Sequence, residues 1–479
     1  MRRSLAVVLL TLAACARPES STRPGWLKPC ALDQIKGDAR CGTYEVFEDR
    51  AARQGRRIGL RVVVLPATAR PAPDPIVFFA GGPGDSAVGN AGYVAATLGG
   101  ARRSRDIILI DQRGTGGSHQ LTCNLYPGTG VARFTRAFMP PEAVETCRTG
   151  LSTQATLGLY TTTIAVDDVA EVIEALGYDR VNLAGASYGT RMAQVFLRRH
   201  PRRVRTAILL GVSPLADRIP ITFPRDAQTA LDGLLAECER TPECRSAFPQ
   251  LRAEAVAVFE RAKRGAIDVT VRDRESGETV NVSLPGDMVG EVVRWMLYSP
   301  VSARRIPDLI HRAASGDWRP LAEAAIARRR DTMTPGSIGL YLSVTCAEDL
   351  PGIDPAEASH EAAGTFLGDY RFREQRAACG RWAAGGVPDD FHEPVVSDAP
   401  VLLLSGALDP VTPADAGADV AARLKNSLHI VVPAGAHGFG GMAGEECLRR
   451  VQADFIERGS VAGLETSCVA NIRPPGFVR

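Results

Sequence analysis

The chain has 479 residues, with 56 lysine and arginine residues against 54 aspartate and glutamate residues and a formal net charge of +2 at pH 7. This near balance, with no basic stripe along the chain, does not favour a nucleic-acid-binding protein. The length exceeds what one small hydrophobic core needs and predicts a core domain that carries a large insertion.

The first fifteen residues have the features of an export signal. Residues 1–3 are basic, and residues 5–12 form an apolar stretch too short to span a bilayer. The stretch ends in Leu-Ala-Ala-Cys, which resembles a bacterial lipobox and predicts lipid modification at Cys15. An ordinary secretory cleavage site that contains a cysteine is the alternative. Residues 16–25, rich in proline, serine and threonine, predict a flexible tether.

The first half of the chain alternates short apolar runs with helical patterns. Residues 57–65 predict an early antiparallel strand, and residues 163–176 have the periodicity of a helix. Four further runs are typical of buried parallel strands, and they occupy residues 76–79, 107–110, 181–184 and 207–210. The pattern predicts an α/β fold, with a mostly parallel central sheet and helices on both faces.

The pattern changes after residue 214. Residues 215–392 consist mainly of amphipathic helices, for example 227–235, 288–297 and 306–314, with one small hairpin at 267–271 and 280–282. Strand patterns resume at residue 400. We therefore predict a core in two parts, residues 26–214 and 393–479, with residues 215–392 forming a helical cap between them.

The most informative motif lies at residues 185–189, Gly-Ala-Ser-Tyr-Gly. It follows the strand pattern of residues 181–184 and precedes a helical pattern at residues 190–197. A G-x-S-x-G sequence between a strand and a helix is typical of the nucleophile elbow of α/β-hydrolases, in which small flanking residues allow a sharp turn. Ser187 is the candidate nucleophile.

Two candidate partners follow in the order that this fold requires. Asp409 follows the apolar run 401–404, and His437 follows the apolar run 428–432 and a glycine-containing loop. The order Ser, Asp, His is that of α/β-hydrolases. An imidazole must take the serine proton, and a carboxylate must orient that imidazole. The alternative is that Asp409 only forms a turn before proline and that His437 is a loop histidine.

A glycine-rich loop supplies a candidate oxyanion hole. Residues 76–79 predict a strand that ends in Ala-Gly-Gly-Pro-Gly at residues 80–84. In this fold the loop donates one backbone N–H and the residue after the nucleophile donates the other. We assign Gly82, with Gly81 as the near alternative, and Tyr188. A plain tight turn is the competing interpretation of the loop.

Eleven cysteines are present, and setting Cys15 aside leaves an even ten. In an exported chain this number predicts disulfides. Connectivity cannot be deduced from the sequence, but the spacing favours near neighbours: Cys30–Cys41, Cys123–Cys147, Cys238–Cys244, Cys346–Cys379 and Cys447–Cys468. No two cysteine pairs have the spacing of a zinc site, so we expect no metal. The chemistry of the triad requires no cofactor.

These residues together resemble the secreted tripeptidyl/prolyl aminopeptidase group of α/β-hydrolases, the TAP-like serine peptidases. The similar segments are residues 80–84, 111–118 (Asp-Gln-Arg-Gly-Thr-Gly-Gly-Ser), 160–162, 238–244, 295–300, 409–413 and 435–438. Two positions depart from the family pattern. Ala80 replaces the usual histidine of the glycine-rich loop, and Tyr188 stands where strict proline iminopeptidases usually carry tryptophan. The second departure points to the exported tripeptidyl-type branch.

The resemblance implies an aminopeptidase, which must recognise a free α-ammonium group through acidic residues of the cap. Glu348 and Asp349 are the candidates, because a carboxylate pair in a cleft would attract an ammonium group. A solvated pair at a helix end is the alternative.

We therefore expect an exported serine hydrolase, anchored by lipid at Cys15 to a membrane of the bacterial cell envelope, that releases N-terminal residues or short peptides. A carboxylesterase or lipase acting on small acyl esters is the main alternative, since the same triad serves both. A binding protein that lost its activity is the third.

Overall fold

The computed structural model describes residues 24–69, 71–333 and 336–479. The predicted signal peptide, Cys15 and most of the predicted tether lie outside the described residues. In the described part of the chain, no helix combines the length and the apolar character that a membrane span requires.

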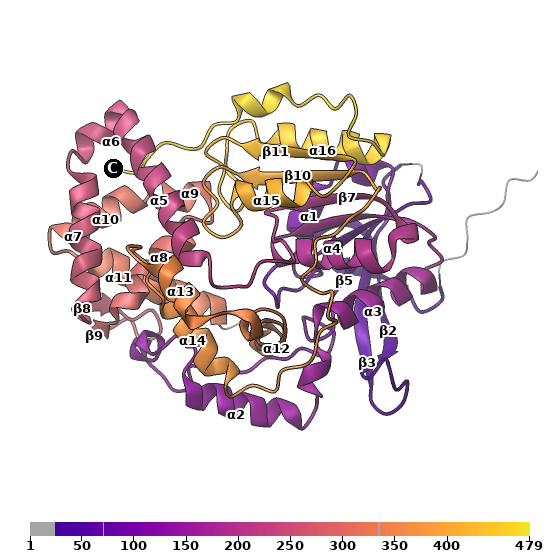
Figure 1. The fold of residues 1–479 in the computed structure, drawn as a ribbon, viewed down its shortest axis with the longest axis horizontal. Helices are drawn as coiled ribbons and strands as arrows, with labels where there is room; N and C mark the ends of the chain where they lie inside the picture. Colours follow the sequence, from indigo (N-terminus) through magenta and orange to yellow (C-terminus); the bar gives the residue numbers. More distant parts are fainter. Residues whose placement is uncertain (1–23, 70, 334–335) are drawn as a thin grey trace, which may run out of the picture.

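One nine-stranded sheet forms the core (Figure 1). Its strand order is β1-β2-β3-β5-β4-β6-β7-β10-β11, antiparallel from β1 to β5 and parallel from β5 to β11. The strands are β1 (Lys28–Leu32), β2 (Ile35–Phe47), β3 (Arg57–Leu65), β4 (Ile76–Phe79), β5 (Ile107–Ile110), β6 (Val181–Ala186), β7 (Val204–Leu210), β10 (Val401–Gly406) and β11 (Ser427–Val432). The predicted α/β class and mostly parallel sheet are thus confirmed.

Helices cover both faces of this sheet. Helices α3 (Thr162–Ala175), α4 (Tyr188–Arg199) and α15 (Ala414–Ala421) pack apolar side chains against one face. Helices α1 (Ala91–Thr97) and α16 (Glu446–Arg458) pack against the other face. Both faces of the central strands are therefore buried, which explains why β4 and β5 are continuously apolar.

Between β7 and β10 the chain leaves the sheet and forms a separate helical layer (Figure 1). The small antiparallel hairpin predicted within this segment is present as β8 (Ile267–Arg272) and β9 (Thr279–Leu284). Its helices are α5 (Phe223–Arg240), α6 (Pro242–Ala247), α7 (Leu251–Lys263), α8 (Gly286–Met296), α9 (Pro300–Ala303), α10 (Ile306–Ala314), α11 (Arg319–Met333), α12 (Ile338–Glu348), α13 (Pro355–Ala362) and α14 (Tyr370–Cys379). We call this layer the cap.

One helix outside the predicted cap segment also belongs to this layer. Helix α2 (Pro141–Ser152) precedes Ser187 in the chain, yet it contacts α12 and α14. Figure 1 shows α2 beneath α14, away from the sheet. Helix α2 thus packs against the cap although the predicted cap segment begins only at residue 215, because spatial neighbours of a helix cannot be read from its periodicity.

All five predicted disulfides are present in the structure. Their Cα–Cα distances are 5.1–6.0 Å, within the usual range for this bond. Two of them lie wholly within the predicted cap segment, Cys238–Cys244 and Cys346–Cys379.

Candidate active site

Ser187 occupies the turn between β6 and α4 with a backbone φ of 54° and ψ of −126°. A non-glycine residue in this region of φ/ψ space is strained, and such strain persists only where the surroundings impose it. The Ser187 N–H donates to the carbonyl of Leu210 on the neighbouring strand β7, at 2.9 Å. The backbone at Ser187 is therefore held in place by the next strand of the sheet.

The flanking glycines are required by close packing around this turn. A Cβ atom on Gly189 would collide with the carbonyl oxygen of Phe79, at the end of β4. A Cβ atom on Gly185 would collide with the carbonyl oxygen of Gly189. The two glycines let the turn close against β4, which is the physical basis of the motif.

Asp409 and His437 form an ion pair in the loops that follow β10 and β11. The Nδ1 atom of His437 lies 2.8 Å from Oδ2 of Asp409, whose side chain is fully buried. The other carboxylate oxygen of Asp409 accepts the N–H groups of Val411 and Thr412, each at 2.9 Å. The carboxylate is thus fixed by its own turn and can orient the imidazole.

The side chain of Thr412 also contacts this pair, although the sequence motifs did not identify this threonine as a site residue. Its hydroxyl lies 2.7 Å from Asp409 Oδ2 and 3.0 Å from His437 Nδ1. The hydroxyl therefore contacts both members of the pair. The Asp-Pro-Val-Thr sequence was visible as a family motif, but nothing in it indicated that the threonine turns back toward the carboxylate.

The structure brings Ser187 and His437 to the wall of one cavity. In the described part of the chain no hydrogen bond joins the two side chains, and such catalytic hydrogen bonds often tighten only in the complex with substrate. The residues predicted for the oxyanion hole, Gly82 and Tyr188, line the same cavity, and so does Gly81. None of these three amides donates to another group among the described residues. All three N–H groups remain available for an oxyanion.

The glycine-rich loop is supported from behind by the motif at residues 111–118. The carboxylate of Asp111 accepts hydrogen bonds from Ser86 Oγ at 2.6 Å, from the Val88 N–H at 3.0 Å and from the Gly117 N–H at 2.9 Å. Asp111 is almost fully buried. It connects the turn after β5 to the segment that follows the loop, and so helps to hold Gly82 near Ser187.

The cavity has a volume of about 490 Å³ and lies between the sheet and the cap. Its core side carries the glycine-rich loop, Ser187 and His437. Its cap side is formed mainly by aromatic and arginine side chains, Phe223, Arg294, Trp295, Tyr298, Arg328, Tyr341 and Arg371. A site of this size suits a ligand of a few residues or a comparable acyl group.

Charge on the cap side is partly balanced by one buried glutamate. Arg294 and Arg371 each lie 3.3 Å from Glu291, and Trp295 Nε1 donates to the same carboxylate at 2.8 Å. Burial would raise the pKa of Glu291, but the two guanidinium groups outweigh it and lower this pKa to about 2. Glu291 is therefore ionised and fully engaged in the cap.

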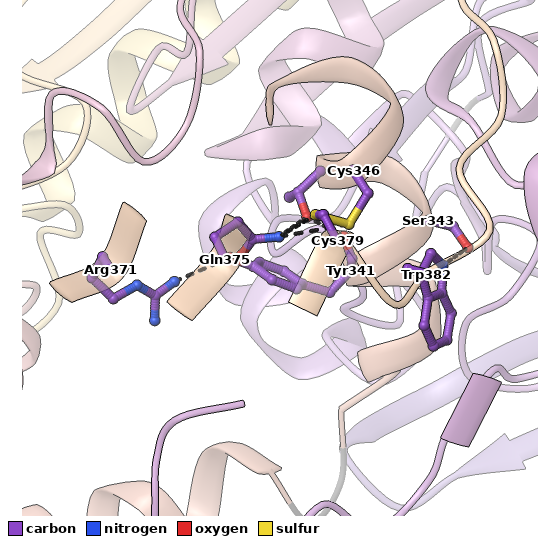
Figure 2. The surroundings of a disulfide bond; sticks show 8 residues. Tyr341, Ser343, Cys346, Arg371, Gln375, Cys379 and Trp382 are labelled. Atoms are coloured by element: carbon purple, nitrogen blue, oxygen red, sulfur yellow. Dashed lines mark hydrogen bonds between the residues drawn. A yellow bond between two sulfur atoms is a disulfide. The ribbon is translucent and has the colours of Figure 1, made fainter. Parts of the chain in front are cut away.

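A disulfide fixes two helices of this wall to each other. Figure 2 shows Cys346 of α12 bonded to Cys379 of α14, with Gln375 beside the sulfur atoms. Gln375 accepts a hydrogen bond from Tyr341 at 2.9 Å, and Arg371 donates to the same tyrosine hydroxyl at 3.0 Å. Because Tyr341 lines the cavity, the cross-link restrains a wall of the site.

Glu348 and Asp349 do not line this cavity, contrary to the prediction that they contact the substrate. Glu348 is fully buried, and its carboxylate accepts the Thr162 N–H at 2.6 Å and contacts the Thr162 hydroxyl at 2.7 Å. It therefore caps the first turn of α3, where a carboxylate is favoured. Burial is the main cause that raises the pKa of Glu348 to about 7.

The side chain of Asp349 is also bound by other residues of the protein. Its carboxylate forms a 2.6 Å ion pair with Arg191 of α4 and accepts the Ile219 N–H at 3.1 Å. Both side chains of the pair are about 1% exposed. A carboxylate already paired with a buried guanidinium is not available to an ammonium group, so the assignment of these two acids as direct substrate ligands was wrong.

This fold and this arrangement of serine, histidine and aspartate at the carboxyl ends of parallel strands define an α/β-hydrolase. A family model described as alpha/beta hydrolase fold matches residues 74–257, and one described as TAP-like protein matches residues 365–468. These matches support a TAP-like α/β-hydrolase family, and the chain is a serine hydrolase with the α/β-hydrolase fold.

Three curated relatives are similar over most of their length. Serine protease Hip1 of Mycobacterium tuberculosis is 27% identical, with 89% of each chain covered. The tripeptidyl aminopeptidase of Streptomyces coelicolor is 22% identical over 93% of this chain and 86% of its own. Carboxylesterase B of Mycobacterium tuberculosis is 25% identical over 81% of this chain and 78% of its own.

Proposed function

We propose that this protein is an aminopeptidase that releases N-terminal residues or short peptides through an acyl-enzyme on Ser187. The observation that carries the proposal is the cavity itself. The cap covers Ser187 and leaves about 490 Å³, enough for one end of a peptide and too little for the middle of a folded chain. The similarity to a serine protease and a tripeptidyl aminopeptidase supports a peptide substrate.

The chemistry follows from the positions of the side chains. Ser187 Oγ attacks the carbonyl carbon of the scissile bond, and His437 takes the hydroxyl proton. Asp409 stabilises the imidazolium that forms, while the Gly82 and Tyr188 amides bind the oxyanion. Collapse of the tetrahedral intermediate passes the proton to the departing amine and leaves the acyl-enzyme. Water, deprotonated by His437, then releases the acid and restores Ser187.

A panel of para-nitroanilides tests this function. Alanyl and tri-alanyl amides are assayed with a free and with an acetylated N-terminus, and Ser187→Ala serves as the control. We expect turnover of the free amides, little turnover of the acetylated ones and none in the variant. Equal rates for free and acetylated amides would contradict an aminopeptidase.

A carboxylesterase is the second candidate, favoured by the relative of that name and by the largely aromatic and aliphatic cavity wall. The same triad would cleave an ester without any change in its chemistry. Rapid hydrolysis of small acyl esters, with no turnover of any amide in the panel, would favour this function over the peptidase.

Export and lipid anchoring belong to the same proposal. Five disulfides support an oxidising compartment, and Cys15 supports attachment to a membrane of the bacterial cell envelope. Cells fed an alkyne-labelled fatty acid test the anchor. The label should appear in the wild-type chain and be absent from Cys15→Ser, and a wild-type chain that stays unlabelled would refute it.

A further inference from the structure

A free N-terminus inside the cavity requires a negative partner, and the structure leaves one candidate. Among the described residues that line the cavity, Asp85 is the one acidic residue. Its carboxylate makes no hydrogen bond and no ion pair with any described residue. Burial raises the pKa of Asp85, and the guanidinium of Arg328 across the cavity partly offsets this rise. The side chain is exposed, and the surface that it exposes faces the cavity. It differs in this respect from Glu291, Glu348 and Asp349, whose carboxylates are all engaged.

Asp85 also lies close to the nucleophile. It follows the glycine-rich loop directly, and its N–H donates to the Gly81 carbonyl at 3.4 Å. A Cβ atom placed on Gly81 would lie 3.2 Å from Ser187 Cβ and 3.7 Å from Asp85 Oδ2. Because both atoms lie this close to one point beside Gly81, Ser187 Cβ and Asp85 Oδ2 are at most about 7 Å apart.

This upper limit is compatible with one residue of substrate between the two side chains. The α-ammonium nitrogen of an aminoacyl group lies about 2.5 Å from its carbonyl carbon, and a charge-assisted hydrogen bond adds roughly 2.8 Å. Each further residue of extended chain would move the nitrogen away by about 3.5 Å. The ammonium of an aminoacyl group on Ser187 is thus within reach of Asp85, whereas that of an extended tripeptidyl group is beyond it.

We propose that Asp85 binds the α-ammonium group of the residue whose carbonyl Ser187 attacks, so that the enzyme releases single N-terminal residues. This inference rests on the aminopeptidase function proposed above and makes it more specific. The ammonium group donates a hydrogen bond to the Asp85 carboxylate, whereas a neutral acyl group at the same place cannot.

The test compares substrates that differ only in the ammonium group. Alanyl and propionyl para-nitroanilides have the same carbon skeleton, and Asp85→Asn keeps the shape of the side chain. We expect Asp85→Asn to lower kcat/KM for the alanyl amide by about 10- to 100-fold. The rate with the propionyl amide should not change. Asp85→Glu should recover part of the loss because it keeps the charge.

Two controls make the result specific. Asp389→Asn removes one carboxylate from an exposed position outside the cavity and should leave both rates unchanged. Labelling of Ser187 by a fluorophosphonate probe reports whether each variant is folded and reactive. The aminopeptidase function itself fails if two results occur together. The wild type would cleave alanyl and propionyl amides equally well, and it would cleave tri-alanyl amides equally well with a free or an acetylated N-terminus.

The inference can fail while that function stands. A preference for the alanyl amide that persists at its wild-type ratio in Asp85→Asn would overturn the role of Asp85. An enzyme that cleaves the free tri-alanyl amide but no aminoacyl amide would also overturn it, because the ammonium group would then lie beyond reach of this carboxylate.

Discussion

The ring of Tyr298 lies edge-on against the ring of His437, with centroids 4.9 Å apart and planes inclined by 64°. The Gly438 N–H also donates to the Tyr298 carbonyl, at 3.2 Å. Tyr298 follows α8 in the cap, whereas His437 belongs to the core. The imidazole is therefore held between a carboxylate of the core and an aromatic ring of the cap.

This contact predicts different effects for two substitutions of Tyr298. Tyr298→Ala removes the ring and should lower kcat about 2- to 10-fold, since an aromatic pair contributes about 0.5–1.5 kcal/mol. Tyr298→Phe keeps the ring and loses only the hydroxyl that accepts from Arg294 at 2.9 Å. Steady-state kinetics on one amide measures both. Equal losses in the two variants would mean that the hydroxyl, and not the ring, supports His437.

Thr412 gives a second test of how the imidazole is positioned. Thr412→Val removes the hydroxyl beside Asp409 Oδ2 at nearly constant volume, and it should lower kcat by about 10-fold because one net hydrogen bond is lost. Thr412→Ser keeps the hydroxyl and should retain most of the activity. The fall should appear in kcat more than in KM. Wild-type kcat in Thr412→Val would contradict a positioning role.

The sequence predicted the parts of the site that depend on local structure. Ser187, Asp409 and His437 each follow a short apolar strand, and parallel strands deliver the residues that follow them to one edge of the sheet. Their convergence needed only the order of the motifs. The antiparallel strands β1 and β2 were missed because neither shows a clear alternation of apolar and polar residues. No residue of β1 is buried, and β2 mixes charged and apolar residues with two glycines.

The parts that failed depend on contacts between distant residues. Glu348 meets Thr162 across 186 positions of sequence, and Arg191 meets Asp349 across 158. No local pattern distinguishes an acid that caps a buried helix from one that faces a cleft. Asp85 was passed over for a related reason, since only the finished cavity reveals that its carboxylate has no hydrogen-bond partner among the described residues.

Glu348 predicts a measurable dependence of stability on pH. Its pKa is raised from an ordinary 4.5 to about 7 in the folded state, with burial as the main cause. The folded protein therefore binds this proton more tightly than the unfolded chain does. The stability that this provides is complete below pH 4.5, and it is lost as the pH rises through about 7.

The substitution Glu348→Gln isolates this effect. An amide can still accept the Thr162 N–H and donate to the Thr162 hydroxyl, and it has no charge to bury. Measured by urea unfolding, the variant should gain stability relative to the wild type between pH 5 and pH 8, by an amount on the order of a few kcal/mol. A constant difference over this range would show that Glu348 does not change its protonation on unfolding.

Asp349 tests whether an acidic residue of the cap can be needed for stability without contacting the substrate. Asp349→Asn would remove the charged partner that contacts the buried Arg191 guanidinium directly, and removing one member of a buried pair typically costs about 3–5 kcal/mol. The free energy of unfolding should fall by that amount, while Asp389→Asn at the surface should change it little. At a temperature where the variant is folded, its preference for alanyl over propionyl amides should equal that of the wild type. A lost preference in a fully folded Asp349→Asn would restore this residue as a substrate ligand and move the recognition of the N-terminus from the glycine-rich loop back to the cap.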